Sequence, residues 1–434
     1  MKYKRSELQI SKYRNLTRWT ALPPRLKRWG MSDTPRGTYF NRTSPPHIST
    51  LILLAGISAM SMNVFLPSLP GMAAWFEVDY SVMQLSVAVY LAMNAILQIL
   101  VGPISDKFGR RPIILGGVLI YLVATLGCIL APNATVFLIF RMMQAVIAVA
   151  MVLSRAVVRD IYSQDRAASM IGYVTMGMAV VPMIAPAIGG MLEQIWGWRA
   201  NFALLMLCGG MVFIIAWNDL GETARKSDNT LAGQFREYPE LLKSPRFWGY
   251  CMASALGSGA FFAYLGGAPF VASDVFGLSP SEMGLYFAAP SIGYFLGNWI
   301  TGAFAARVGV NRMVLYGTLI GTFGMALSLV SSYTGHSGPI SFFGFMTLVG
   351  IGNGMTISNA TAGMLSVRPH LAGTASGLGG AIMIGGGAAL SALAGALLVP
   401  GAGEFPLIWI MFITSALAIL AILSVIWRER QIGM

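Results

Sequence analysis

Long apolar runs are the feature that most limits how this chain can fold. Stretches of about twenty mostly apolar residues recur along the sequence, and a helix of that length crosses the hydrocarbon core of a bilayer. Only 11% of the residues are charged, whereas a soluble domain carries about 25%. The runs are continuous and do not alternate with period two, which favours helices over strands. The chain is therefore predicted to be an all-α integral membrane protein.

Twelve transmembrane helices are predicted, in two bundles of six. We place them at 49–68, 82–103, 112–131, 135–157, 167–191, 199–218, 248–273, 281–304, 313–333, 339–361, 372–398 and 404–427. Polar residues and glycines interrupt the apolar runs of the eighth and the tenth predicted helices. The expected organisation is a basic tail (1–47), a first bundle (48–218), a cytoplasmic linker (219–247), a second bundle (248–427) and a C-terminal tail (428–434).

Lysine and arginine are concentrated on one side of this predicted topology. The formal net charge is +12, and 27 of the 29 basic residues fall in the tails or in loops on the same side. The exceptions are Arg141, inside the fourth span, and Arg199, on the opposite side. This distribution is the positive-inside pattern, so both termini are predicted to be cytoplasmic. It also accounts for the basic excess without a nucleic-acid partner.

The beginning of the chain and its cysteines carry little further information. Residues 1–30 lack the apolar stretch of a signal peptide. Met31 precedes a short polar leader and the first span, so we take Met31 as the hypothetical translation start in place of Met1. Cys128, Cys208 and Cys251 lie in or beside apolar spans. Their odd number and spacing predict neither a disulfide nor a metal site, and no cofactor is expected.

A short motif occurs in both halves of the chain. The segment Gly102-Pro-Ile-Ser-Asp-Lys-Phe-Gly109 follows the second span, and a degenerate copy, Gly302-Ala-Phe-Ala-Ala-Arg-Val-Gly309, follows the eighth. The offset is 200 residues, which equals the spacing of matching loops in the two halves. We interpret this as internal duplication, a design in which the transport site lies between the repeats.

The loop motif and a second one resemble signatures of the major facilitator superfamily. The first reads Gly102-x-x-x-Asp106-Lys107-x-Gly109-Arg110-Arg111, and the second, in span four, reads Arg141-x-x-Gln144. In span five, Gly177, Pro182, Pro186, Gly189 and Gly190 resemble the Gly/Pro motif of its drug–proton antiporters. The stretch Phe65-Leu66-Pro67-Ser68-Leu69-Pro70 resembles the bicyclomycin/chloramphenicol (Bcr/CflA) branch.

This resemblance covers residues 48–427 and implies a function. Its members have a two-bundle fold, work by alternating access and export small, mostly hydrophobic compounds as protons enter. The resemblance thus implies a monomeric transporter of the bacterial inner membrane whose partners are a hydrophobic substrate, protons and the lipid bilayer. In that family the charged loop latches the bundles together and takes part in switching.

The residues expected to act in gating lie in that loop and in span five. Arg110 can fork onto a carboxylate, and Asp160, at the inner end of span four, is its expected partner. A solvated turn that only fixes topology remains the alternative. Pro182 and Pro186 interrupt the backbone ladder of span five, which suits a helix that bends at the bundle interface. The full gating set is Gly102, Asp106, Gly109, Arg110, Arg111, Arg155, Asp160, Pro182, Pro186 and Gly190.

Arg141 is the most informative residue of the predicted substrate pathway. It lies about 12 Å from the outer end of span four, and a cation at that depth normally faces a cavity or a partner. Gln144, Met151 and Arg155 follow near one helix face. A role in transport is therefore predicted for Arg141. The alternatives are snorkelling to the interface or a fixed pair within the bundle.

Other polar and aromatic side chains complete that pathway. Tyr90, Asn94 and Gln98 recur every four residues of span two, where they either line a cavity or bond a neighbouring helix. In span seven Phe261, Phe262 and Tyr264 are expected to form an apolar wall or simply to pack. The full predicted set is Asn63, Tyr90, Asn94, Gln98, Arg141, Gln144, Phe261, Phe262, Tyr264 and Asn298, with Asn353 and Asn359 as weaker candidates.

Asn63 is the main departure from the family pattern. The Bcr/CflA branch places an aspartate there, and an amide cannot titrate. None of the 17 acidic residues is predicted at mid-membrane depth. Three interpretations remain: Asp106 or Asp160 carries the proton, the substrate is charged with Arg141 as its counter-charge, or the protein is a facilitator.

Export of hydrophobic small molecules is the leading functional hypothesis. A specific metabolite exporter or facilitator without proton coupling is the second, and a sensor or scaffold that reuses the fold is the third. No paired intramembrane carboxylates, metal cluster or Ser/His/Asp set points to an enzyme. No phosphate-binding loop points to ATP-driven pumping.

Overall fold

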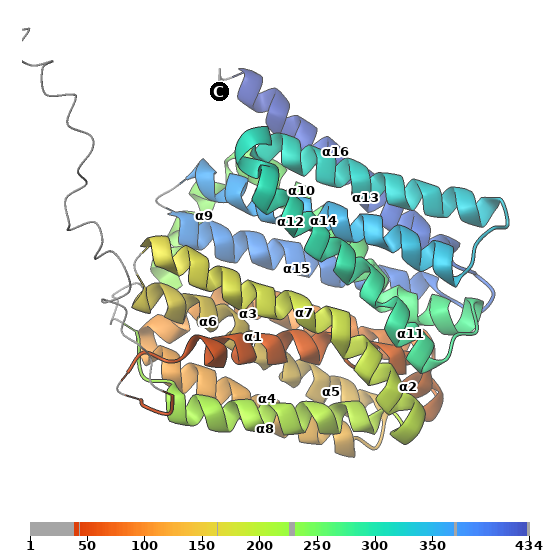
Figure 1. Ribbon diagram of the computed structural model, residues 1–434, viewed down its shortest axis with the longest axis horizontal. Coiled ribbons are helices and arrows are strands. Elements are labelled where there is room, and N and C mark those ends of the chain that lie inside the picture. The colour runs from red at the N-terminus through yellow and green to blue at the C-terminus, as the bar shows by residue number, and fades with distance from the viewer. Residues whose placement is uncertain (1–38, 43, 163, 225–230, 369–370, 432–434) are drawn as a thin grey trace, which may run out of the picture.

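The computed structural model describes residues 39–431 except 43, 163, 225–230 and 369–370 (Figure 1). The proposed start at Met31 lies outside the described residues. Helices of the first half are α1 (Ile48–Asn63), η2 (Leu66–Ser68), α2 (Leu69–Trp75), α3 (Tyr80–Phe108), α4 (Arg110–Leu130), α5 (Ala134–Gln144), η3 (Ala145–Ile147), α6 (Ala148–Ile161), α7 (Gln164–Trp196) and α8 (Arg199–Asp219). The linker holds α9 (Leu231–Leu242). The second half contains α10 (Pro245–Phe270), η4 (Val271–Val275), α11 (Pro280–Tyr286), α12 (Ala288–Val308), α13 (Val310–Tyr333), α14 (Pro339–Val367), α15 (Ala372–Leu397) and α16 (Phe405–Gln431).

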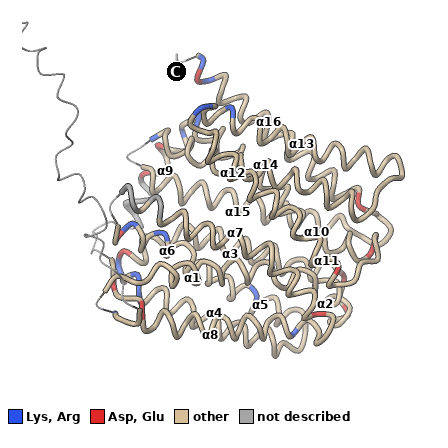
Figure 2. The backbone as a smooth tube through the Cα atoms, in the orientation of Figure 1, with Lys and Arg blue, Asp and Glu red and all other residues tan. Residues whose placement is uncertain are grey.

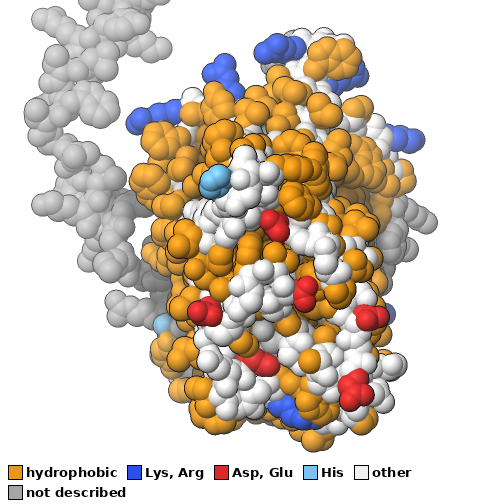
Figure 3. All heavy atoms as spheres, turned by 90° about the vertical axis from the view of Figure 1, so that its right-hand side faces the viewer, with side chains coloured by type: hydrophobic (Ala, Val, Ile, Leu, Met, Phe, Trp, Pro, Cys, Tyr) orange, Lys and Arg blue, Asp and Glu red, His pale blue; other side chains and the backbone are white. Residues whose placement is uncertain are grey.

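The helices form two bundles whose axes run roughly parallel. In Figure 1, α1–α8 occupy the lower bundle and α10–α16 the upper one. Basic side chains gather at one end of both bundles, beside α9, which we call the basic end (Figure 2). The opposite end shows several acidic side chains on its surface and is called the acidic end (Figure 3). These acids are Glu77, Asp79, Glu193, Asp274, Glu282 and Glu404.

The predicted all-α membrane fold is confirmed. In the described part of the chain, eleven helices are long and apolar enough to cross a bilayer. The remaining predicted span is α11 with α12, which are separated at Phe287. This span is the eighth, in which glycines and polar residues interrupt the apolar run. Several helices extend past their predicted spans, as α14 does to Val367, because a helix continues beyond the apolar core wherever water can solvate its side chains.

Backbone geometry supports the internal repeat. Gly109 ends α3 with φ 96° and ψ 150°, and Gly309 ends α12 with φ 89° and ψ 150°. Both glycines precede the next helix directly, at α4 and α13. A positive φ is readily adopted by glycine and disfavoured for other residues. The two loops that match in sequence therefore also share one uncommon backbone conformation.

Each bundle has its own means of holding its helices together. At the basic end of the first, Asp219 of α8 accepts hydrogen bonds from the His47 amide (2.9 Å) and the Thr50 hydroxyl (2.6 Å), which ties α8 to the start of α1. A carboxylate there also opposes the positive end of the helix dipole. In the second bundle α12 and α14 approach closely, since a Cβ at Gly293 would meet the Thr347 carbonyl.

Candidate transport cavity

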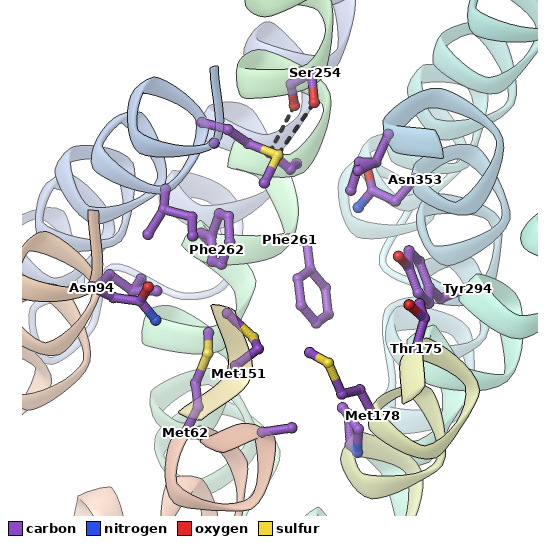
Figure 4. A pocket seen from close by; sticks show the side chains of 18 of the residues that line it. Met62, Asn94, Met151, Thr175, Met178, Ser254, Phe261, Phe262, Tyr294 and Asn353 are labelled. Atoms are coloured by element: carbon purple, nitrogen blue, oxygen red, sulfur yellow. Dashed lines mark hydrogen bonds between the residues drawn. The ribbon is translucent and has the colours of Figure 1, made fainter. Parts of the chain in front are cut away.

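A cavity of about 380 Å³ lies between the two bundles. Its walls come from α1, α3, α6 and α7 of the first bundle and from α10, α12, α14 and α15 of the second. Figure 4 shows this arrangement, with Met62, Met151 and Met178 on one side and Phe261 projecting into the space. Methionine is flexible and polarizable, so such a wall adapts to ligands of different shape.

Polar groups are spaced around this mostly apolar wall. Asn94, Thr175, Tyr294 and Asn353 reach the cavity from four different helices (Figure 4). Within the described structure the Asn94 Oδ1 atom is buried and has no hydrogen-bond partner. Asn63 also lines the cavity, and its amide donates to the Ala59 carbonyl at 2.7 Å. A few such polar groups in an apolar pocket are what orients a small ligand.

The cavity is deep at one end only. On α14 and α15 its lining reaches Met364 and Ser376, about 5–6 Å along the axis from the basic ends of these helices. Towards the acidic end it stops at Gly350 and Ile384, about 15 Å or more from the helix ends. The cavity therefore extends towards the basic end.

Contacts between the bundles close the acidic end. Gln84 of α3 donates to the Ser391 carbonyl of α15 at 2.6 Å, and the Tyr80 hydroxyl donates to the Gly266 carbonyl at 2.7 Å. Across α7 and α11 the hydroxyl of Ser281 donates to the side chain of Gln194. These three hydrogen bonds join the two bundles across the interface, so the bundles must separate there before the cavity opens to that side.

Glycines make part of this closure possible. A Cβ at Gly190 of α7 would meet the Pro280 carbonyl, and one at Gly284 of α11 would meet the Pro186 carbonyl. Gly190 and Pro186 thus lie at the closed seam between the bundles, whereas Pro182, one helical turn further, lines the cavity. Pro182, Pro186 and Gly190 of the span-five motif thus lie along the bundle interface.

Arg141 lies inside the first bundle, with its side chain fully buried. Its guanidinium donates to the Ser61 carbonyl (2.9 Å), the Ser86 carbonyl (3.3 Å) and the side chain of Gln144. The Phe65 and Tyr90 rings cover its two sides, with centroids 4.2 and 4.3 Å from Cζ. Cation–π contacts of this kind are favourable when water is excluded.

The structure therefore does not place Arg141 or Gln144 at the cavity. Gln144 donates instead to the Thr125 hydroxyl at 2.8 Å. Both residues lie nearer the acidic end than Met151 and Arg155, which do line the cavity. Tyr90 explains the difference, because its ring lines the cavity and covers the Arg141 guanidinium at 4.3 Å, so that Arg141 lies one side chain behind the cavity wall. Sharing a helix face was not enough to share a cavity.

Two further predicted pathway residues also lie elsewhere. Tyr264 is buried in the second bundle, where its ring packs against Phe287 (5.1 Å between centroids) and Phe343 (6.3 Å). Asn298 is bound to its own bundle through the Tyr294 carbonyl (2.8 Å) and Ser358 (2.7 Å). The predicted residues that do line the cavity are Asn63, Tyr90, Asn94, Gln98, Phe261 and Phe262, with the weaker candidate Asn353. The other weak candidate, Asn359, bonds the Met355 carbonyl of its own helix and Thr301.

The charged loop forms a cluster at the basic end. Arg110 pairs with Asp106 (2.6 Å) and with Asp160 (3.1 Å), so the predicted Arg110–Asp160 pair is present. Gly109 supplies the turn, while Gly102 has open space around it.

Glu222 at the start of the linker completes this cluster. It accepts hydrogen bonds from the backbone amides of Arg110 (2.8 Å) and Arg111 (3.2 Å) at the N-terminus of α4. The Arg111 side chain donates to the Leu220 carbonyl at 2.8 Å. All these partners belong to the first bundle or the linker start, so in the described residues the cluster makes no latch to the second bundle.

Several lining residues were absent from the predictions, among them Met62, Met178, Tyr294 and Ser376. A soluble helix reveals its buried face by hydrophobic periodicity. In a membrane bundle both lipid and core are apolar, so periodicity does not separate the cavity face from the others. Arg155 was predicted as a gating residue, but it lies in the cavity wall, as does Pro182 of the same set.

The chain resembles known transporters over most of its length. The family model described as Major Facilitator Superfamily matches residues 51–392. The chloramphenicol resistance protein of Pseudomonas aeruginosa is 32% identical over 75% of this chain and 78% of its own length. Multidrug resistance protein D of Escherichia coli (strain K12) is 29% identical, covering 82% and 90%. These relatives confirm the resemblance to the Bcr/CflA branch.

Solved structures share the fold at low sequence identity. A POT family transporter in complex with 5-aminolevulinic acid superposes with a TM-score of 0.73 at 13% identity, covering 92% of this chain and 99% of the other. A bacterial homolog of the human lysosomal transporter Spinster, in an inward-facing and occupied conformation, gives 0.66 at 20% identity, covering 88% and 96%. The cavity between two bundles, the repeated loop and these matches agree: this chain is a multi-pass membrane protein that belongs to the Major Facilitator Superfamily.

Proposed function

We propose that this protein exports hydrophobic small molecules from the cytoplasm across the bacterial inner membrane by alternating access. The observation that carries the proposal is the cavity itself. It lies between the bundles, has mostly apolar walls with a few polar groups, and extends towards one end while contacts close the other. Pockets of this size and character suit drug-sized ligands.

The distribution of Lys and Arg indicates which end of the bundles faces the cytoplasm. Lys and Arg near membrane spans favour the cytoplasm, and they gather at the basic end of both bundles (Figure 2). We therefore assign the basic end, with both termini, to the cytoplasm. The described conformation is then inward-facing, which is the state in which an exporter takes up its substrate.

The names of relatives support a drug as the substrate. Besides the chloramphenicol resistance protein, a bicyclomycin resistance protein homolog of Haemophilus influenzae is 26% identical over 86% of this chain. The methionine and phenylalanine wall fits several ligand shapes, because flexible side chains repack around different compounds. Enzymatic activity is not part of the proposal.

Proton antiport, which the family implies, is the proposed coupling. No carboxylate lines the cavity in the described part of the chain, and Asn63 occupies the position where the family carries an aspartate. The carboxyls closest to a switching role are Asp106 and Asp160, which share Arg110 at the basic end. Protonation of either one would weaken its pair with Arg110 and loosen the cluster.

Uptake of chloramphenicol into inverted membrane vesicles tests this function. Export from the cytoplasmic face becomes uptake into the lumen, so vesicles with an acidic lumen are expected to accumulate the compound severalfold above vesicles lacking the protein. Nigericin, which collapses the pH gradient, should return uptake to the background. Asp160→Asn should reduce the dependence on the gradient, because an amide cannot carry the proton.

Asp79→Asn is the matched control, since Asp79 is a carboxyl at the acidic end outside the charged cluster. It should retain the gradient dependence. Equal uptake with and without the pH gradient in the unsubstituted protein would exclude proton antiport. Uptake at the background level for chloramphenicol and for a panel of uncharged hydrophobic antibiotics would contradict drug export.

A further inference from the structure

Two arginines lie within the membrane-spanning part of the first bundle, in opposite environments. Arg141 is enclosed by hydrogen-bond acceptors and aromatic rings, as described above. Arg155 of α6 lies about 9 Å along the axis from the basic end of that helix and lines the cavity. An intramembrane cation is costly unless it is paired or solvated, so an unpaired one marks a functional position.

The guanidinium of Arg155 has few partners. Among the described residues its Nε atom is buried without a hydrogen-bond acceptor, and its Nη2 atom contacts the Met178 sulfur at 3.8 Å. A thioether sulfur is a weak acceptor. Arginine carries five N–H donors and stays charged, so most of its capacity for hydrogen bonds is open to a ligand.

No counter-charge accompanies Arg155 in the cavity. Of the described residues that form the wall, Arg155 is the one charged side chain, and the other polar groups are hydroxyls and amides. One of these, the Tyr294 hydroxyl of α12, belongs to the same cavity wall and comes from the other bundle (Figure 4). The site therefore combines a positive charge from the first bundle with a neutral donor from the second.

We propose that Arg155 is the binding group for an organic anion, so that the preferred substrates are hydrophobic compounds with one carboxylate. This inference rests on the proposed export function and specifies its substrate class. A guanidinium binds a carboxylate through two parallel N–H···O bonds. Phe261 and Phe262 offer aromatic surface to the body of the same molecule.

The charge of the cavity also excludes a class of substrate. A cation entering this space meets Arg155 at close range with no carboxylate in the described wall to offset it, so cationic drugs are disfavoured. An anion leaving an inside-negative cell moves down the electrical gradient. The sequence suggested Arg141 as the counter-charge of an anionic substrate, but the Arg141 donors already bond the Ser86 and Ser61 carbonyls. Arg155 takes that role in this proposal.

Binding of a matched ligand pair to the purified full-length protein in nanodiscs tests the proposal. The probes are radiolabelled 1-naphthaleneacetate and 1-naphthaleneacetamide, which share one ring system and differ in charge. The carboxylate is expected to bind about tenfold or more tightly than the amide, as a charge-assisted pair of hydrogen bonds predicts. Arg155→Gln should remove this preference, and Arg155→Lys should retain part of it.

Arg159→Gln is the control, because Arg159 is an exposed arginine one turn further along α6. It removes the same charge and should keep the preference. Persistence of the preference in Arg155→Gln, or its loss in Arg159→Gln as well, would overturn the assignment. If the protein exports chloramphenicol but binds both probes equally, the anion site is refuted and the export function stands. If it exports nothing, the proposed function itself fails.

Discussion

Joining the bundles through Gln194→Cys and Ser281→Cys is expected to lower transport by more than about tenfold, because opening of the acidic end is a step of every cycle. These two residues already meet across α7 and α11 in the closed seam. A short bismaleimide reagent applied to the double variant should lock that seam. Transport of a radiolabelled substrate in proteoliposomes, before and after the reaction, measures the effect.

The close packing around this seam explains why one link should suffice. Gly284 and Gly190 allow the backbones of α11 and α7 to touch, so the two helices pack without a gap at this point. A covalent tie at this point prevents the two bundles from separating. A partial opening around the tie is disfavoured because packed helices shift as rigid units.

The single variants Gln194→Cys and Ser281→Cys are the controls, since each reacts with the reagent without bridging the bundles. Both should retain most of their transport after treatment. Substrate binding from the basic end should survive in the crosslinked double variant, as the cavity stays open to that side. Full transport by a protein shown to be crosslinked would refute alternating access across this seam.

Arg141→Met is expected to cost about 3–5 kcal/mol of stability, because three buried acceptors lose their donor and each unsatisfied buried polar group costs about 1–3 kcal/mol. The substitution keeps a long side chain but removes every donor to the Ser61 and Ser86 carbonyls and to Gln144. It also removes the cation between the Phe65 and Tyr90 rings. For a bundle of this size the melting temperature should fall by about 10 °C, as measured by thermal unfolding in detergent.

Arg155→Gln provides the comparison, because Arg155 and Arg141 lie in the same membrane span, Ala134–Ile161. The Arg155 guanidinium has few hydrogen-bond partners in the described structure, so the melting temperature of the Arg155→Gln protein should stay unchanged or rise slightly. An Arg141→Met protein as stable as the unsubstituted one, with lost substrate binding, would restore the pathway role that the sequence suggested. The two substitutions thus distinguish a structural cation, Arg141, from a ligand-binding cation, Arg155.

The fold was largely predictable because its signals are local. Apolar runs of bilayer length located the helices, and the alternation of basic loops predicted which helix ends lie together at the basic end. The repeat of Gly102–Gly109 at Gly302–Gly309 indicated two equivalent halves, and Gly109 and Gly309 do share one backbone conformation. The break at Phe287 was harder to predict, because glycine and polar residues weaken the apolar pattern without marking where a helix ends.

The cavity was only partly predictable because it depends on depth and on packing between the bundles. The stripe of Tyr90, Asn94 and Gln98 identified the correct face of α3, since polar groups in a membrane helix need a wet or bonded environment. Arg141 and Arg155 looked alike in sequence, both being cations on one helical face. Which of them meets a cavity depends on where the bundles diverge, and that is a tertiary property.

Blocking the cavity from the basic end is the most direct test of the account. Ser376→Cys places a thiol on the exposed cavity lining of α15, where a membrane-impermeant polyethylene glycol maleimide can reach it in inverted vesicles. We expect labelling to lower transport by about tenfold or more, since the reagent fills the inward-facing pathway, and substrate to slow the labelling. Arg430→Cys on α16, exposed beyond the end of the predicted span at 427, should be labelled without effect. Undiminished transport by fully labelled Ser376→Cys protein would show that substrates take another route.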